Sequence, residues 1–428
     1  MLQITQIREN PEKIIALLTI KNFDAKEVIN NIIILDNKKR ALQKKGDDTQ
    51  FEANKLAKEI GVLFQSGKTN EANALKENTS LLKAEIKNIG DELNQIQTDL
   101  DRLIVSLPNT PHESVKKGKS HEDNEIIYSE GSLERNENML PHWDLANKYN
   151  LIDFELGNKI TGAGFPVYKG KGARLQRALI NFFIDKGLEA GYTEIQPPLF
   201  VNEASAYGTG QLPDKDSQMY FVQLDNFYLI PTAEVPVTNI YRDVILKTAD
   251  LPLKNVAYSS CFRREAGSYG KDVRGLNRLH QFDKVEIVQI QLPEKSYEAL
   301  EEMKEYVCNL IRLLGLPFRV LKLCGGDMSF TSALTYDLEV YSKGQDKWLE
   351  VSSVSNFETF QSNRMKIRYK DENGKSKLVH TLNGSALALP RIVAALLENN
   401  QTEKSLPTGK QGIVIPKCLI PYTGFDLI

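Results

Sequence analysis

The chain has 428 residues, which is enough for two or three domains and at least one sizeable hydrophobic core. Hydrophobic residues make up 41% and charged residues 26%, and the formal net charge of −2 excludes a broadly basic nucleic-acid-binding protein. There is no apolar run long enough to span a membrane, no apolar signal core at the N-terminus and no CxxC pair among the four cysteines. We therefore expect a cytoplasmic protein without a membrane segment or a structural zinc site.

The first hundred residues have the pattern of a coiled coil. Apolar residues in 70–107 recur at alternating steps of four and three, and the same register runs through 28–63. Between the two segments, QSGKTNE signals a turn in which Gly67 ends one helix and Thr69 or Asn70 caps the next. The pattern predicts a long antiparallel helical hairpin, with limbs about 55 Å in length.

One limb of this hairpin carries a basic stripe within NKKRALQKK, although the first 110 residues contain equal numbers of acidic and basic side chains. Such a stripe is either a solvated face of the coiled coil or a track for phosphate groups. Its cations are Lys38, Lys39, Arg40, Lys44 and Lys45.

A polar stretch at 108–125 contains two prolines and lacks any periodicity, as a linker does. We therefore expect an N-terminal coiled-coil domain at 1–110, a linker at 111–130 and a second domain at 131–428.

The second domain mixes signals for helices and strands. Helical spacing of apolar residues predicts helices at 173–192 and 296–316. Because strand-like runs cluster with few strand–helix alternations, we predict an α+β fold with an antiparallel sheet flanked by helices, not a doubly wound sheet. The strand-like runs lie at 193–201, 227–232, 256–265, 280–292, 333–342 and 347–357.

A basic, glycine-containing segment, CFRREAGSYGKDVRGLNRLHQF, links two of these runs. A loop of this kind is either a solvated hairpin tip or a site for an anionic ligand. Its cationic side chains, counting a protonated histidine, are Arg263, Arg264, Lys271, Arg274, Arg278 and His280.

The two-residue period of a strand places acidic, aromatic and cationic side chains of three neighbouring runs on one sheet surface. Carboxylates seldom face a core unless they are paired or bind a ligand. An arginine for phosphate, an aromatic ring for a base and carboxylates for an ammonium group or Mg²⁺ together indicate a site for a nucleotide and an amine. The residues so placed are Thr232, Glu234, Arg263, Glu265, His280, Phe282, Lys284 and Glu286.

Three motifs resemble the signatures of class II aminoacyl-tRNA synthetases. GYTEIQPP is similar to the first motif, FRREAG with HQFDKVE to the second, and LNGSALALPRIVAALLEN to the third, in which a strand runs into a helix with Pro390 in its first turn. GTGQLP, TAEVP and the N-terminal hairpin resemble seryl-tRNA synthetases of the bacterial type. The resemblance covers essentially the whole chain, with the motifs in the expected order.

The resemblance implies a homodimeric enzyme that activates L-serine with ATP as substrate and Mg²⁺ as cofactor. The seryl-adenylate would then react with the 3′-terminal adenosine of a serine tRNA, whose long extra arm would lie on the hairpin. The basic stripe would supply the tRNA contacts. Whether a selenocysteine tRNA is also charged stays open.

Carried over residue by residue, the resemblance also implies a role for each part of the sheet site. Arg263 would hold the α-phosphate, and Glu350 with Ser353 would hold Mg²⁺, so that Arg263 and Glu350 are the expected catalytic residues. Phe282 and Arg391 would enclose the adenine ring. The complete ATP set is Arg263, Arg264, Glu265, Phe282, Glu350, Val351, Ser352, Ser353 and Arg391. The serine set is Thr232, Ala233, Glu234, Glu286 and Ser385.

Several alternatives remain at this stage. The catalytic domain could belong to a ligase that adenylates an amino acid for a carrier protein, or to an inactive scaffold. Ser385 could be a strand-end cap, Glu265 could be a structural partner of Arg264, and His280 and His380 are expected to be structural. The sequence departs from the family pattern at Val354, Ala386 and Pro390.

Overall fold

The computed structural model describes residues 1–135, 138–214, 217–265, 274–402 and 411–428. Lys271 of the basic segment lies outside these residues. The chain forms two compact units. The first comprises 1–19 and 23–108, and the second comprises 20–22 and 109–428.

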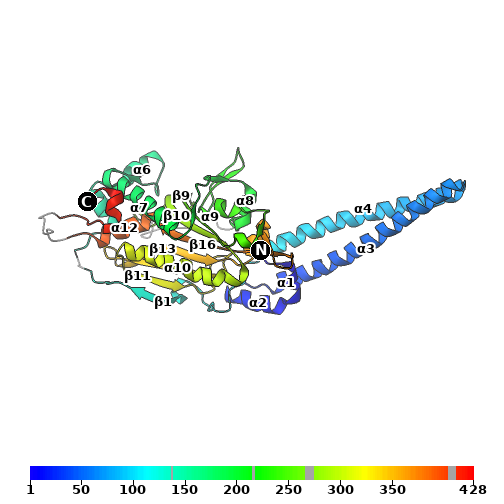
Figure 1. Cartoon of the computed structure of the whole chain (residues 1–428), viewed down its shortest axis with the longest axis horizontal. Coiled ribbons are helices and arrows are strands. Elements are labelled where there is room, and N and C mark those ends of the chain that lie inside the picture. Colours follow the sequence, from blue (N-terminus) through cyan, green and yellow to red (C-terminus); the bar gives the residue numbers. More distant parts are fainter. Residues whose placement is uncertain (136–137, 215–216, 266–273, 403–410) are drawn as a thin grey trace. The chain divides into compact units, whose positions relative to one another are not determined.

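The first unit contains the predicted hairpin (Figure 1). Two short helices, α1 (Ile4–Glu9) and α2 (Pro11–Ile20), precede the limbs α3 (Lys26–Gln65) and α4 (Thr69–Ser106). The limbs pack along each other and bury apolar residues from both helices, which confirms the coiled-coil hairpin. The buried seam includes Ile29, Ile32, Ala53, Ala72, Ile89, Ile96, Leu100 and Ile104.

The turn between the limbs is closed by the backbone. Gly67 has a φ of 77°, as expected for the residue that ends α3. The backbone N–H groups of Ser66, Gly67 and Lys68 donate to the last carbonyls of α3. The predicted side-chain cap is wrong, because Lys68 occupies the N-cap position of α4 without a side-chain hydrogen bond and Thr69 is already helical.

The second unit is built on an eight-stranded sheet in the order β1-β11-β12-β13-β16-β10-β9-β4. Every neighbouring pair is antiparallel except β4 and β9, so the predicted antiparallel α+β fold is confirmed. The strands are β1 (Glu125–Glu130), β4 (Thr193–Glu194), β9 (Leu253–Phe262), β10 (Gln281–Gln291), β11 (Phe318–Lys322), β12 (Leu334–Ser342), β13 (Lys347–Asn356) and β16 (His380–Ala388).

Smaller sheets and helices surround this sheet. The helices are α5 (His142–Lys148), α6 (Phe154–Ile160), α7 (Gly170–Glu189), α8 (Glu203–Thr209), α9 (Glu234–Asn239), α10 (Ser296–Leu313), α11 (Phe360–Met365), α12 (Leu389–Asn399) and α13 (Ile420–Thr423). The short strands are β2 (Ile152–Asp153), β3 (Val167–Tyr168), β5 (Phe200–Val201), β6 (Phe221–Val222), β7 (Phe227–Leu229), β8 (Ile245–Lys247), β14 (Arg368–Lys370) and β15 (Ser376–Leu378).

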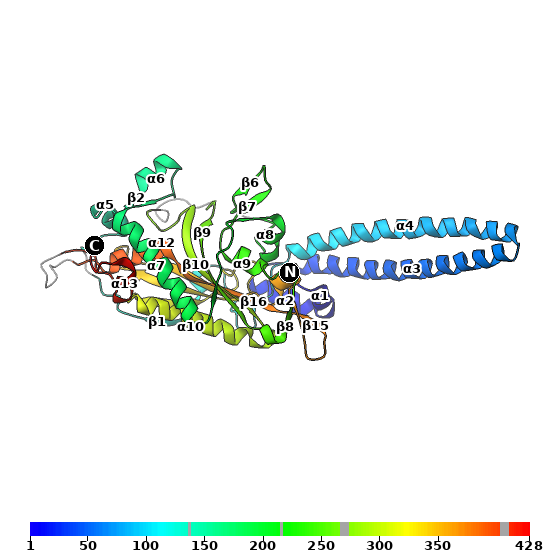
Figure 2. The same ribbon diagram turned by 45° about the horizontal axis from the view of Figure 1, so that its top comes forward.

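The main core lies between the sheet and three helices, α7, α10 and α12 (Figure 2). On β10, Val285 and Ile287 are fully buried in this core. Because side chains alternate along a strand, Lys284 and Glu286 project from the opposite face of the sheet. The helices therefore cover one face and leave polar side chains of the central strands on the other.

Three segments differ from the sequence interpretation. Residues 125–130, assigned to the linker, form the edge strand β1. The run 193–201 forms only the short strands β4 and β5, because Pro197 and Pro198 between them have no N–H for a ladder. The run 227–232 ends at Leu229.

The interpretation of IPTAEVP as a strand is also wrong. Glu234 is the first residue of α9, and its backbone N–H donates to Thr232 Oγ1 at 3.2 Å. A local side-chain acceptor of this kind favours a turn over an extended strand. Thr232 and Glu234 therefore meet through a turn and not through strand alternation.

Candidate active site

A cavity of about 580 Å³ lies on the sheet face that carries Lys284 and Glu286. Its walls come from β10, β13, β16, the first turn of α12 and the loops around 231, 276 and 330. Twelve residues of the predicted ATP and serine sets line it: Thr232, Glu234, Arg263, Glu265, Phe282, Glu286, Glu350, Val351, Ser352, Ser353, Ser385 and Arg391.

Two residues of these sets, Ala233 and Arg264, are not among those lining the cavity. Ala233 is fully buried and packs against Val237 and Val288. Arg264 is exposed, and its backbone N–H donates to the Gln218 carbonyl. Their chain neighbours Thr232 and Arg263 line the cavity, but the side chains of Ala233 and Arg264 do not.

The most buried part of the cavity is a polar cluster around Glu286, which is 1% exposed. Lys284 Nζ lies 2.5 Å from Glu286 Oε2, and Thr232 Oγ1 donates to the same oxygen at 3.1 Å. Ser385 is the cross-strand neighbour of Glu286 on β16. Ser385 thus lies within a strand, so its interpretation as a strand-end cap is wrong.

Glu234 lies beside this cluster. The pKa of its carboxyl group is raised to about 7, mainly because the group is buried; the hydrogen bond from Gln361 opposes this shift and the nearby Glu286 carboxylate adds to it. Gln361 Nε2 donates to Glu234 Oε1 at 2.6 Å. The cavity therefore holds two buried carboxyl groups and one lysine, an arrangement that attracts an additional cation.

A different chemistry occupies the other half of the cavity. The Arg263 guanidinium lies over the Phe282 ring, 5.3 Å from its centroid. Arg391 Nη1 donates to the Glu350 carbonyl at 2.6 Å, and its Nε donates to the Asn277 carbonyl at 3.1 Å. Two arginines and an aromatic ring suit phosphate groups and a planar base.

Glu350 and Ser353 reach the same cavity although they are three residues apart on β13. A regular strand would place them on opposite faces. A register shift between β12 and β13 leaves Val351 without a partner, and this bulge restores the common face. Ser353 Oγ donates to Asp337 at 2.5 Å, and burial, followed by the charge of Glu350, raises the pKa of Asp337.

Several lining residues were not assigned a role from the sequence. Arg278 Nη1 pairs with Glu265 Oε2 at 3.1 Å, so the partner of Glu265 is Arg278 and the alternative pairing with Arg264 is wrong. Lys284 was placed on the correct face by strand alternation, but its ion pair with Glu286 required the fold. His280 does not line the cavity, because its ring stacks on Phe165.

Among the described residues, no group of three or more His, Cys, Asp or Glu side chains is arranged to hold a metal ion. No helix in the described part of the chain has the length and apolar composition needed to cross a bilayer.

Two family models match the chain. Residues 1–111 match the seryl-tRNA synthetase N-terminal domain, and residues 220–400 match the tRNA synthetase class II core domain (G, H, P, S and T). Two curated relatives, both serine--tRNA ligases, are 50% identical (Salinibacter ruber) and 45% identical (Prosthecochloris aestuarii). Each alignment covers 100% of this chain and 99% of the relative.

Solved structures agree with these relatives. The seryl-tRNA synthetase of Pyrococcus horikoshii complexed with ATP superposes with a TM-score of 0.93 at 33% identity, over 100% of this chain and 99% of that one. The cytoplasmic serine-tRNA ligase of Naegleria fowleri in complex with AMP gives a TM-score of 0.88 at 26% identity, over 100% and 98%. The chain therefore belongs to the seryl-tRNA synthetase family of class II aminoacyl-tRNA synthetases.

Proposed function

We propose that the protein attaches L-serine to serine tRNA in two steps. The serine carboxylate attacks the α-phosphate of ATP to give seryl-adenylate and pyrophosphate, and a hydroxyl of the 3′-terminal adenosine of tRNA then takes the seryl group. The observation that carries this proposal is one cavity that combines buried carboxylates with two arginines and an aromatic ring. ATP–pyrophosphate exchange with each of the twenty amino acids tests it directly, and serine alone should support rapid exchange.

The family match favours this reaction over the alternatives. A ligase that loads a carrier protein has no evident need for a hairpin matching the seryl-tRNA synthetase N-terminal domain over residues 1–111. An inactive scaffold has no reason to keep the cavity residues, and Arg263, Glu265, Glu286 and Glu350 are all present.

The serine half of the cavity is the cluster around Glu286. Glu234 and Thr232 would bind the α-ammonium group, since a buried carboxylate and a hydroxyl are suitable acceptors for it. Glu286 and Ser385 would bind the side-chain hydroxyl.

The ATP half is lined by Arg263, Phe282 and Arg391. Arg263 would bind the α-phosphate and stabilise the charge that develops there, while Phe282 and Arg391 would enclose the adenine and Glu265 would contact its edge. None of these residues acts as a nucleophile, so the rate enhancement comes from positioning and electrostatic stabilisation.

Glu350 and Ser353 fit a magnesium ion bound together with ATP. Mg²⁺ prefers oxygen ligands and usually takes one or two from protein, with phosphates and waters supplying the rest. The bulge at Val351 turns this carboxylate and this hydroxyl to the same cavity. When bound, the ion would neutralise phosphate charge.

The proposal also covers tRNA binding by the hairpin, the oligomeric state and the cellular location. The α3–α4 hairpin would bind the long extra arm of serine tRNA through its basic stripe. The chain would act as a cytoplasmic homodimer, and the exposed apolar side chains of the edge strand β1, Ile126, Ile127 and Tyr128, are suited to a contact between subunits.

Replacing Arg263 with alanine should lower serine-dependent pyrophosphate exchange by at least about 10²-fold, because one preorganised donor to developing charge is typically worth 10²–10³. Arg177→Ala is a matched control, since Arg177 is exposed on α7 and does not line the cavity. A folded Arg263→Ala protein with near-normal exchange would remove Arg263 from the reaction.

The KM for serine should fall as the pH rises through neutrality. Below the Glu234 pKa of about 7 the carboxyl group is protonated and cannot pair with the ammonium group of serine. For a pKa of about 7, the ionised fraction of Glu234 rises about tenfold between pH 6 and pH 8. The KM for serine should fall by a similar factor. Glu234→Gln should remove this dependence and keep the KM high. A wild-type KM for serine that is constant across this range would contradict the role of Glu234.

A further inference from the structure

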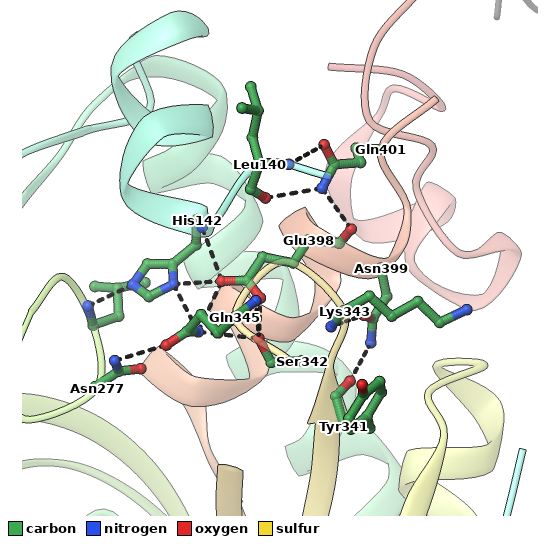
Figure 3. Close-up of polar contacts among 11 residues, drawn as sticks. Leu140, His142, Asn277, Tyr341, Ser342, Lys343, Gln345, Glu398, Asn399 and Gln401 are labelled. Carbon is green, nitrogen blue, oxygen red and sulfur yellow. Dashed lines mark hydrogen bonds and ion pairs between the residues drawn. The ribbon is translucent and has the colours of Figure 1, made fainter. Parts of the chain in front are cut away.

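A buried polar network joins His142, Gln345 and Glu398 (Figure 3). His142, the first residue of α5, and Glu398, in the last turn of α12, are both fully buried. Glu398 Oε1 accepts from the His142 backbone N–H at 2.8 Å and contacts the ring Nδ1 at 2.7 Å. Gln345 Nε2 also donates to Oε1, at 2.8 Å, and Ser342 donates to the other carboxylate oxygen. The network joins α5, α12 and the turn between β12 and β13.

The second ring nitrogen of His142 faces the segment 274–279. The backbone N–H of Leu276 lies 2.8 Å from His142 Nε2. Because a backbone N–H can only donate, Nε2 must be the acceptor and the ring proton must be on Nδ1, facing Glu398. Glu398 thus selects the tautomer that can hold the Leu276 backbone.

The same segment makes two further contacts with the start of α5. Gly275 has a φ of 67°, and a Cβ there would lie 2.2 Å from His142 Nε2, so the contact requires glycine. The Arg274 guanidinium lies over the Trp143 ring, 4.5 Å from its centroid. His142 and Trp143 together fix the path of the chain from 274 to 276.

This path determines where an ATP-side arginine lies. Leu276 and Asn277 both line the cavity. The Asn277 carbonyl accepts from Arg391 Nε, and its side chain donates to Gln345 Oε1 at 2.9 Å. Arg391 is therefore linked to His142 through two consecutive residues of the backbone and, by a second route, through Gln345.

We propose that His142, oriented by Glu398, is a positioning residue for ATP binding. It fixes the backbone of Leu276 and Asn277, and thereby the Arg391 guanidinium, without touching a substrate. This inference rests on the proposed assignment of the Arg391 side of the cavity to ATP. The serine side is built on Thr232, Glu234 and Glu286, whose hydrogen bonds and ion pairs lie outside the network.

Two substitutions separate the two bonds of the His142 ring. Asparagine places its amide near the position of Nδ1, so His142→Asn keeps a partner for Glu398 but loses the acceptor for Leu276. Glutamine reaches the position of Nε2, so His142→Gln keeps that acceptor. The KM for ATP in serine-dependent pyrophosphate exchange should rise about tenfold in His142→Asn, which corresponds to about 1.4 kcal/mol. In His142→Gln it should stay within about twofold, because the hydrogen bond to Leu276 is retained. The KM for serine should be unchanged in both.

Two controls accompany these variants. His380→Asn replaces another buried histidine, whose ring contacts Ser296 at 2.7 Å, and it should leave the KM for ATP unchanged. Arg391→Ala tests the ATP assignment itself. If Arg391→Ala leaves the KM for ATP unchanged, that assignment fails and the inference fails with it. If Arg391→Ala raises the KM while His142→Asn does not, only the positioning role is wrong.

Two other results would overturn the inference. One is an equal KM for ATP in wild type, His142→Asn and His142→Gln. The other is a parallel rise in the KM for ATP and for serine together with a lower Tm, which is the result expected of an ordinary packing role. If His142→Asn does not fold, Gln345→Met takes its place, because it removes the link between Glu398 and Asn277 at similar side-chain length. A rise confined to the KM for ATP would support the inference, and an unchanged KM would overturn it.

Discussion

Alanine should be activated at least about 10⁴-fold less efficiently than serine, because a site built to bind a hydroxyl group leaves buried polar atoms unpaired when that group is missing. The motifs follow one another without a long inserted segment, and we therefore expect a single site to select the amino acid. The expected preference for serine over alanine therefore has to come from the polar cluster around Glu286.

The geometry of Glu286 explains why the ratio should be large. Lys284 Nζ and Thr232 Oγ1 both contact Oε2 of Glu286, whereas no hydrogen bond to Oε1 is formed within the described part of the chain. Glu286 is 1% exposed and lines the cavity, so Oε1 is available to a ligand hydroxyl and is otherwise poorly solvated. Binding alanine would leave this charged oxygen buried without a donor.

Pyrophosphate exchange measured with serine, alanine and threonine tests this prediction. Threonine should also be rejected, because its extra methyl group would clash in the occupied pocket.

Glu286→Gln should reduce serine activation strongly, since it disrupts the pair with Lys284. Asp283→Asn is the matched control, because Asp283 does not line the cavity and instead accepts hydrogen bonds from Gln176 and Ser260. A wild-type preference of only tenfold for serine over alanine would show that Glu286 and Ser385 do not recognise the hydroxyl.

Shortening the hairpin should lower the charging of serine tRNA by about 10³-fold or more, since several cationic contacts to phosphate would be lost together. Lys38 Nζ and Glu92 Oε1 lie 2.7 Å apart across the two limbs, so a Gly/Ser linker that replaces residues 38–92 would join the limbs at a level where they face each other. Serine-dependent pyrophosphate exchange should be retained, because no proposed catalytic residue lies in this segment. The loss should appear mainly as weaker tRNA binding.

The cations of the basic stripe should not contribute equally. Lys38 and Lys45 pair with Glu92 and Glu85 on α4, and Lys39 donates to Gln97 at 2.5 Å. Arg40 and Lys44 are exposed and have no such partner among the residues that the structure describes.

Charge reversal provides the control for the shortened hairpin. Arg40→Glu with Lys44→Glu should weaken tRNA binding and flatten its salt dependence more than Lys38→Glu with Lys45→Glu. Normal charging by the shortened protein would remove the hairpin from tRNA recognition. Loss of both activation and charging in a folded protein would mean that the hairpin supports the catalytic domain instead.

The sequence alone determined the features that depend on local periodicity. The hairpin limbs follow from heptads because each apolar position repeats on the same helix face, and Gly67 marks the turn because only glycine adopts its φ without cost. Phe282, Lys284 and Glu286 were placed on one surface because β10 pairs with β9 residue by residue through that stretch, so its side chains alternate regularly.

The tertiary structure decided the features that depend on partners distant in the chain. Thr232 and Glu234 reach the cavity through a turn that packs against β10, and the strand period could not reveal it. The bulge at Val351 arises from pairing with β12, and three cations of the basic stripe are engaged by the opposite limb. His142 and Leu276, which are hydrogen-bonded, are more than a hundred residues apart in the sequence, and so are Asn277 and Arg391. Local sequence specifies which face a side chain occupies, but only the packed fold specifies which charges are already paired and which remain for a ligand.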